Sequence, residues 1–249
     1  MQKFFVKSSQ IEDDEIRIIG TDVNHIINVL RLKSDDEIQV CNEETSQNYI
    51  CKINNYNKEE ILCGIVEKIE SKAETKVIID VYQGVPKADK MELIIQKTTE
   101  LGAKSITPVA MERCVSKITG KDENKKIERW QKIAEVAAKQ SKRDVIPTIN
   151  SVNTIKELCL KIKDYDIFLV AYEEERQQKL KTILQQAKIE KIGVLIGPEG
   201  GIDKKEIDML VEKGAKIVTL GNRILRTETA GFTAASLIQY ELGDLGGVI

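Results

Sequence analysis

The stretch KIGVLIGPEGG, residues 191–201, joins a short apolar run to a glycine-rich turn, and a helical pattern begins at Asp203 directly after it. This order is typical of a buried strand that passes through a tight turn into a helix. Glycines at the end of a strand let the backbone approach a ligand closely, although a purely structural turn has the same composition. The spacing fits neither GxGxxG nor GxxxxGK(S/T), so the sequence disfavours a dinucleotide or ATP site.

Further apolar runs alternate with helical stretches in the same part of the chain. They cover residues 77–82, 105–109, 166–171 and 216–220. Buried runs separated by helices indicate a parallel sheet that is covered on both faces. The expected helices include one between Asp89 and Gly102 and one that begins at Asp203 and ends at Gly214. We therefore predict an α/β domain over residues 73–249.

The residues before this domain follow a different pattern. Short runs with period-two alternation cover residues 4–6, 37–41, 48–53 and 61–66. Several such strands in close succession predict a small β-barrel, with a turn at 54–57 and one helix over 22–32. The expected first domain covers residues 1–72.

A second stretch, LGNRILRTETA (residues 220–230), follows the last apolar run and precedes a helix rich in small residues. Two loops at the ends of successive strands fit the rule that open α/β sheets bind ligands at their carboxyl edge. Arg226 and Glu228 lie at the helix start, where the helix dipole does not favour arginine. This mismatch favours a functional role for Arg226 over a structural one.

Charge is unevenly distributed over a chain with 38 Lys and Arg, 40 Asp and Glu and a net charge of −2. Residues 1–72 carry 9 basic and 14 acidic side chains, whereas residues 82–147 carry 14 basic and 9 acidic ones. A helix over residues 125–143 would gather several cations within an arc of roughly 80°. These cations, the basic stripe, are Lys125, Arg129, Lys132, Lys139 and Arg143. The stripe is either a solvated helix face or a surface that follows phosphates.

The sequence also excludes several classes of protein. Five cysteines without a CxxC pair favour neither a disulfide framework nor a zinc site, and the single histidine, His25, excludes a multi-histidine metal site. We therefore expect no metal, and chemistry that relies on a cofactor that is already activated. Because the chain lacks a signal-peptide pattern and an apolar run of about 18 residues, we expect a cytoplasmic protein without a membrane span.

The glycine-rich turn and the LGNRILRTETA stretch together resemble the C-terminal signature of the SPOUT-class RNA methyltransferases, and more narrowly that of the RsmE family. That family methylates N3 of a uridine in 16S ribosomal RNA. FF (4–5) and HIINVLR (25–31) resemble the family's PUA-like RNA-binding barrel. KADKM (87–91) with ELG (100–102), and QSKR (140–143) with Pro147, resemble its middle motifs, so the similarity extends over the whole chain.

The resemblance implies an N-terminal PUA-like β-barrel and a C-terminal SPOUT domain, whose parallel sheet contains a deep trefoil knot. It also implies that the two loops hold S-adenosyl-L-methionine. The residues expected to bind this cofactor are Ile196, Gly197, Pro198, Glu199, Gly200, Leu220, Gly221, Ile224, Leu225, Arg226, Thr229 and Ala230. Arg226 and Glu228 are the expected catalytic residues: Arg226 would stabilise negative charge on the uracil, and Glu228 would accept a proton or only hold the ligand loop.

The expected substrate is 16S rRNA in the small ribosomal subunit. The residues expected to contact RNA are Lys3, His25, Arg31, Arg113, Arg129, Lys132, Lys139 and Arg143. The helix over 229–242 carries Ala234 and Ile238 on a face that predicts a homodimer or, alternatively, packing within one domain. The chain departs from the family pattern at Asn222, where proline is usual, at Lys139, where an acidic residue is common, and in the acidic charge of its first domain.

Two other functions stay open on the sequence alone. A non-catalytic RNA-binding or ribosome-assembly factor would keep the same fold and bind no S-adenosyl-L-methionine. A nicotinamide-dependent oxidoreductase is disfavoured by the glycine spacing.

Overall fold

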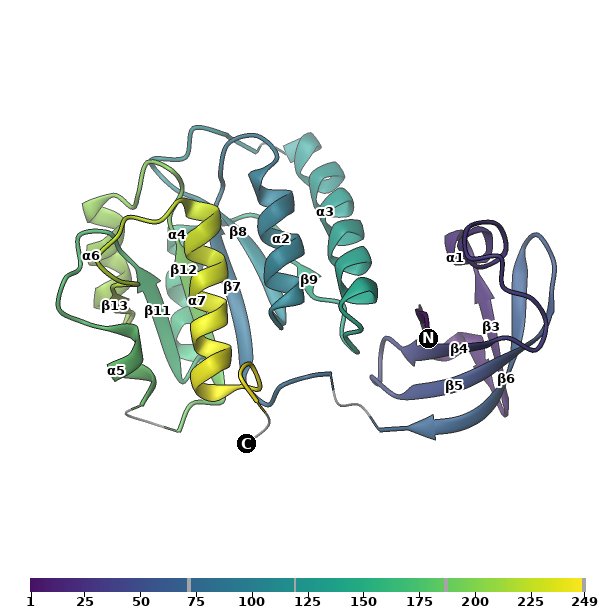
Figure 1. Cartoon of the computed structure of the whole chain (residues 1–249). Helices are drawn as coiled ribbons and strands as arrows, with labels where there is room; N and C mark the ends of the chain where they lie inside the picture. The colour runs from purple at the N-terminus through teal and green to yellow at the C-terminus, as the bar shows by residue number, and fades with distance from the viewer. Residues whose placement is uncertain (71–72, 119, 186–187, 248–249) are drawn as a thin grey trace. The chain divides into compact units, whose positions relative to one another are not determined.

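The computed structural model describes residues 1–70, 73–118, 120–185 and 188–247, and the chain divides into two compact units (Figure 1). Unit 1 comprises Met1–Glu74 and Ala138–Ile146, and unit 2 comprises Thr75–Ala137 and Pro147–Ile249. Residue 72, the last of the predicted first domain, lies outside the described residues. A single boundary near this point does not describe the units, because segment 138–146 groups with unit 1.

Unit 1 is built on a curled six-stranded sheet with the order β1-β4-β5-β6-β3-β2, a half-barrel (Figure 1). Its strands are β1 (Lys3–Val6), β2 (Ile11–Glu12), β3 (Glu15–Ile19), β4 (Glu37–Asn42), β5 (Asn48–Tyr56) and β6 (Glu60–Ile69). The pairs are antiparallel except for β1 with β4. Alternate residues such as Ile16, Ile18 and Ile38 point inward and are fully buried, which is what the period-two pattern requires.

Two local predictions for unit 1 are wrong. Residues 54–56 continue β5 beyond an irregularity in the pairing with β6, and the turn follows at Asn57, whose Oδ1 accepts a hydrogen bond from the Glu59 amide at 2.7 Å. The expected helix over 22–32 is a short α1 (Thr21–Asn24) that continues as a π-helical turn, His25–Val29. The backbone then enters the left-handed region at Arg31, where φ is 57°, so the helix cannot continue.

Unit 2 contains a seven-stranded sheet with the order β10-β8-β7-β12-β11-β13, and β9 also pairs with β8. Its strands are β7 (Ile78–Gly84), β8 (Ser105–Ala110), β9 (Thr148–Ile149), β10 (Asn153–Thr154), β11 (Ile167–Ala171), β12 (Lys191–Ile196) and β13 (Lys216–Val218). Every pair is parallel, as the apolar runs predict. The carboxyl ends of β11, β12 and β13 therefore meet at one edge of the sheet.

Helices cover both faces of this sheet (Figure 1). They are α2 (Lys90–Glu100), α3 (Gly120–Gln140), α4 (Ile155–Lys161), α5 (Leu180–Leu184), α6 (Lys204–Glu212) and α7 (Thr227–Leu242). One core cluster joins the strands to α2, α3, α5 and α7, and another joins them to α4 and α6. As predicted, Asp203 begins α6: its side chain accepts a hydrogen bond from the Lys205 amide at 3.0 Å. Asp89 precedes α2 but makes no such cap.

The predicted helix over 125–143 begins too late and extends three residues too far at its C-terminal end. Helix α3 ends at Gln140, and the backbone turns at Lys142, where φ is 59°. Arg143 therefore lies beyond the helix and does not share a face with Arg129 and Lys132. The small-residue face of α7 also has a local explanation, because Ala234 and Ile238 are buried in the core of their own unit.

Candidate functional site

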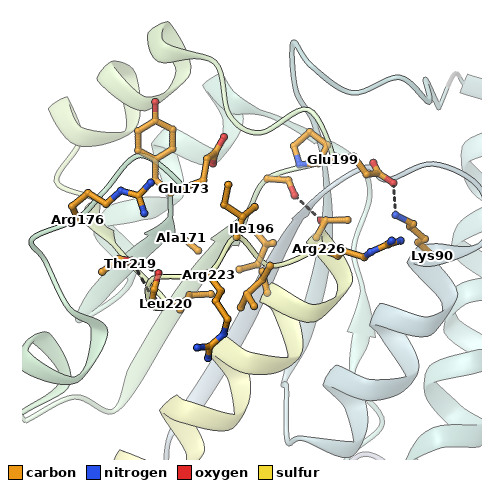
Figure 2. Close-up of a pocket in the computed structure, with 18 residues that line it drawn as sticks. Lys90, Ala171, Glu173, Arg176, Ile196, Glu199, Thr219, Leu220, Arg223 and Arg226 are labelled. Atoms are coloured by element: carbon orange, nitrogen blue, oxygen red, sulfur yellow. Dashed lines mark hydrogen bonds and ion pairs between the residues drawn. The ribbon is translucent and has the colours of Figure 1, made fainter.

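A pocket of about 430 Å³ lies in unit 2, where the carboxyl ends of three strands meet the start of α7 (Figure 2). Ala171 ends β11, Ile196 ends β12, and Thr219 follows β13, and all three line this pocket. Parallel strands that end at the same edge create such a crevice, as expected for an open α/β sheet. The volume lies in the range of about 300–1,000 Å³ that is typical of small-molecule sites.

The glycine turn, residues 197–201, is fixed by close contacts. A Cβ atom on Gly197 would lie 2.8 Å from Cγ1 of Ile202, so a larger residue would displace the turn. Thr227 Oγ1, at the start of α7, donates a hydrogen bond to the Gly197 carbonyl oxygen at 2.6 Å. Gln83, which is fully buried, donates from Nε2 to Thr227 Oγ1 at 2.8 Å. These bonds tie the two ligand loops together beside the pocket.

The outer side of the glycine turn contacts charged residues. Arg113 donates from Nη1 to the Gly200 carbonyl oxygen at 3.3 Å, and its Nη2 lies 3.4 Å from Asp203 Oδ2. Gly201 has a φ of 72°, and the Glu173 carboxylate lies against its Cα. Arg113 thus supports the turn from behind and does not line the pocket.

Lys90 connects the pocket loops to α2. Its Nζ lies 3.0 Å from Glu199 Oε1 and 3.3 Å from Glu228 Oε2, and the side chains of Glu199 and Glu228 are largely shielded from solvent. The Lys87 amide also donates to the Glu199 carboxylate, at 3.2 and 3.3 Å. Burial opposes ionisation of Glu199, but hydrogen bonds from the backbone and Lys90 outweigh it, so the pKa of Glu199 lies below its ordinary value.

The structure brings most of the predicted cofactor-binding residues together. Those that line the pocket are Ile196, Gly197, Pro198, Glu199, Leu220, Gly221, Ile224, Leu225, Arg226 and Ala230. Gly200 packs against Arg113 instead, and Thr229 lies exposed in the first turn of α7. Glu228 is not among the lining residues, and its carboxylate forms an ion pair with Lys90, which is.

Sequence reasoning missed several lining residues: Lys90, Ala171, Tyr172, Glu173, Arg176, Thr219, Arg223 and Thr227. Those from the loop after β11 were missed because no glycine or motif marks that loop. Lys90 lies within the KADKM motif, so a signal for it was present. Arg223 and Thr227 lie inside the LGNRILRTETA stretch and could have been included with their neighbours.

The residues predicted to contact RNA divide into buried and exposed groups. Lys3 and Arg143 are only 4% and 3% exposed. Lys3 pairs with Asp144, and Arg143 Nη2 lies 2.6 Å from Glu74 Oε2, all within unit 1. These two cations hold segment 138–146 against the sheet of unit 1, so their geometry is structural, contrary to expectation.

The remaining cations of this set are more accessible. Lys139 is partly buried in unit 1, where its Nζ lies 2.9 Å from Asp22 Oδ1. Arg129 is exposed and pairs with Glu92, and Lys132 is exposed on the same helix. His25, in the π-helical turn of unit 1, and Arg31, just after it, are exposed, and the His25 and Phe4 rings form a T-shaped pair.

None of the helices in the described residues is long and apolar enough to span a membrane. No group of three or more His, Cys, Asp or Glu side chains in those same residues is arranged to hold a metal ion.

Comparison with families of known proteins gives a match for each part of the chain. The RNA methyltransferase domain family matches residues 73–239, and the RNA methyltransferase PUA domain family matches residues 18–66. Ribosomal RNA small subunit methyltransferase E of Bacillus subtilis is 35% identical over 255 residues, which cover 99% of each chain. The protein of the same name from Aquifex aeolicus is 36% identical and covers 84% of this chain and 88% of its own.

Solved structures agree with this assignment. A Ribosomal RNA small subunit methyltransferase E from Neisseria gonorrhoeae, bound to S-adenosyl methionine, has a TM-score of 0.87 and 28% identity and covers 98% of this chain and 99% of its own. A putative methyltransferase from Legionella pneumophila in complex with the same cofactor has a TM-score of 0.87 and 27% identity, with 98% of both chains covered. The predicted resemblance and the predicted α/β class, with a curled N-terminal sheet and a parallel-strand sheet, are thereby confirmed, and the chain belongs to the family of ribosomal RNA small subunit methyltransferase E.

Proposed function

We propose that this chain transfers a methyl group from S-adenosyl-L-methionine to N3 of a uridine in 16S rRNA of the small ribosomal subunit. The observation that carries this proposal is the pocket in which both signature loops meet, joined by the Thr227–Gly197 hydrogen bond. Family membership and the cofactor-bound relatives support the donor and the rRNA substrate. The uridine N3 specificity rests on the RsmE resemblance.

The residues present fit this donor. One part of the pocket is apolar and suits an adenine ring, with Ile196, Leu220 and Leu225 among its lining residues. Charged side chains, including Glu173 and Arg176, lie at another part, where the polar ends of the donor require partners. When bound, S-adenosyl-L-methionine supplies a methyl group on a positively charged sulfur, so the protein's own residues need only bind, orient and move a proton.

Arg226 is the residue best placed to assist the target base. It lines the pocket at the start of α7, next to the loop that would hold the donor. Loss of the N3 proton leaves negative charge on the uracil, and a guanidinium beside the carbonyl oxygens stabilises that charge. Because N3 lies on the Watson–Crick edge, the base must be unpaired or flipped out of its helix.

Glu228 has the two alternative roles that the sequence analysis gave it: it accepts a proton, or it only holds the ligand loop. Its ion pair with Lys90, which lies on α2, favours the role of holding the start of α7. Replacement by glutamine separates the roles. A proton acceptor would lose most of kcat at neutral pH, whereas a structural carboxylate would lose donor affinity instead.

RNA would be held by exposed cations outside the pocket. Arg129 and Lys132 lie exposed on α3, and His25 and Arg31 lie exposed at the π-helical turn of unit 1. Exposed cations of this kind neutralise phosphates without reading sequence. The acidic composition of residues 1–72 limits the RNA contact of unit 1 to a local patch around this turn.

We also propose the finer properties that the family resemblance implies: a deep trefoil knot around the pocket loops, a homodimer and a cytoplasmic location. Leu237 and Tyr240 of α7 are 41% and 65% exposed and offer apolar surface to a second copy of the chain. Sedimentation tests the homodimer. A chain that stays monomeric at micromolar concentration and still methylates RNA would contradict it.

The decisive experiment combines binding with product mapping. Calorimetry should detect S-adenosyl-L-methionine binding, whereas a non-catalytic RNA-binding factor would show none. Purified protein and S-adenosyl-L-methionine should then restore a block to primer extension at one uridine in rRNA from a strain that lacks this activity. Parallel reactions on free 16S rRNA and on assembled small subunits identify the substrate form. Donor binding without any methylated nucleotide would contradict the proposal.

A further inference from the structure

Lys90 occupies a central position among the charges of the pocket. It begins α2, and its ammonium lies 3.0 Å from Glu199 of the glycine turn and 3.3 Å from Glu228 of α7. The two carboxylates thus come from the two loops that form the pocket. One cation therefore pairs with both of them, and the group keeps a net charge of −1.

Arg226 lines the same pocket as Lys90 and Glu199 and precedes Glu228 by two positions, but it takes no part in these ion pairs. Figure 2 shows its side chain extending toward the side of the pocket that holds Lys90 and Glu199. Among the described residues, no carboxylate forms an ion pair with Arg226. Carboxylates are strong partners for guanidinium groups, because two parallel hydrogen bonds can form. Arg226 is an exposed side chain without such a partner, and both Glu199 and Glu228 are paired with Lys90.

The protonation states are consistent with this arrangement. The hydrogen bond to Glu199 raises the pKa of Lys90, and the bond to Glu228 adds to this effect. The pKa of Glu199 is lowered, as described above. The ammonium and the Glu199 carboxylate therefore both remain charged at neutral pH, and the pair persists under the conditions of the reaction.

We propose that Lys90 is a positioning residue that occupies Glu199 and Glu228 and thereby leaves the Arg226 guanidinium free for the substrate base. This inference rests on the proposed function, in which Arg226 stabilises the uracil anion. In the absence of Lys90, Arg226 would turn to one of the carboxylates and become unavailable. A structural tether between α2 and the pocket loops would have no such effect on Arg226.

The test compares Lys90→Met with Lys90→Arg. Methionine keeps the length of the side chain without its charge, and we expect kcat at saturating donor and RNA to fall at least about tenfold, since a preorganised charge is lost from the site. The donor Kd and the KM for RNA should change less than kcat. Arginine retains the charge and should restore most of the activity.

Removal of the competing carboxylates provides a second readout. In the triple variant Lys90→Met, Glu199→Gln, Glu228→Gln, no acidic partner is left for Arg226, and kcat should rise above that of Lys90→Met. If Lys90 were only a structural tether, kcat of the triple variant would instead fall below that of Lys90→Met.

A crystal structure of Lys90→Met decides the matter independently of activity. We expect an ion pair between Arg226 and Glu199 or Glu228 within 4 Å, the usual limit for such a pair. An Arg226 that remains unpaired in this variant overturns the inference, whatever the kinetics. Failure of the proposed function is recognised separately, because the wild-type chain would then not methylate rRNA at all.

Discussion

In unit 1, Lys3, Lys139 and Arg143 each lie against a carboxylate, whereas Arg176, Arg223 and Arg226 of the unit 2 pocket form no ion pair among the described residues. Both groups contain the same kinds of side chain. They differ in burial and in their distance to acidic residues. A segment rich in lysine and arginine therefore does not by itself indicate an RNA-binding surface. The carboxylates that pair with these cations must be known first. Of the residues expected to contact RNA, Lys3, Lys139 and Arg143 pair with carboxylates inside unit 1.

We expect the largest effect when the buried ion pair between Lys3 and Asp144 in unit 1 is broken. Asp144→Asn keeps the size of the side chain and its contact with Asn48 but leaves the buried Lys3 ammonium without a counter-charge. The free energy of unfolding should fall by about 3–5 kcal/mol, as is usual when one partner of a buried pair is removed. Chemical denaturation measures this change.

The exposed pair Lys52–Asp35 in the same unit provides the control, and Lys52→Met should cost less than about 1 kcal/mol. If Asp144→Asn and Lys52→Met lowered the free energy of unfolding equally, burial would not determine how much an ion pair stabilises unit 1.

The next prediction removes the free guanidinium. Arg226→Met should lower kcat by about 100-fold, in the range found when one charge-stabilising donor is lost. Binding of S-adenosyl-L-methionine should weaken much less, as calorimetry can show. A variant that loses donor affinity in proportion to kcat would place Arg226 in donor binding alone.

A smaller effect is expected from the glycine turn. Gly197→Val forces the turn away from Ile202, and overpacking of this kind typically costs about 1–3 kcal/mol. We expect donor affinity, measured by calorimetry, to weaken accordingly while unit 1 stays folded. Gly120→Val is the matched control, because a Cβ atom at Gly120 meets no described atom within 4 Å. Normal donor binding by Gly197→Val would place the donor outside this pocket.

The smallest effect concerns the exposed cations of α3. The double variant Arg129→Glu, Lys132→Glu should weaken RNA binding and make it less sensitive to salt, since each lost phosphate contact reduces the slope by roughly 0.7–0.9. Lys139→Met is the comparison variant: it removes a cation already paired with Asp22 and should leave the slope nearly unchanged. Filter binding over a range of salt concentrations checks both. An identical slope in all three proteins would make α3 an ordinary solvated helix.

The sequence predicted what depends on neighbouring residues. Strand, glycine turn and helix follow one another within residues 191–212, so the local pattern locates the pocket and most of its lining residues. Arg143 pairs with Glu74 across 69 positions, Lys3 with Asp144 across 141, and the Lys87 amide bonds Glu199 across 112. These contacts form only because the folded backbone brings distant residues together, so the periodicity of apolar residues in the sequence does not predict them. The end of α3 was missed for the same reason, because contacts of segment 138–146 with unit 1 replace the helical continuation.

The membership of segment 138–146 in unit 1 has a consequence for synthesis on the ribosome. The first 74 residues leave the exit tunnel well before Asp144, whose side chain neutralises Lys3 near the beginning of the chain. During this interval the Lys3 ammonium has no buried counter-ion, so the nascent sheet cannot reach its final packing. Of the 249 residues, 144 must be translated before Lys3 in the earliest strand acquires its counter-ion. An expression fragment that stops at residue 74 would reproduce this incomplete intermediate, whereas one that extends past Ile146 would carry both pieces of the unit.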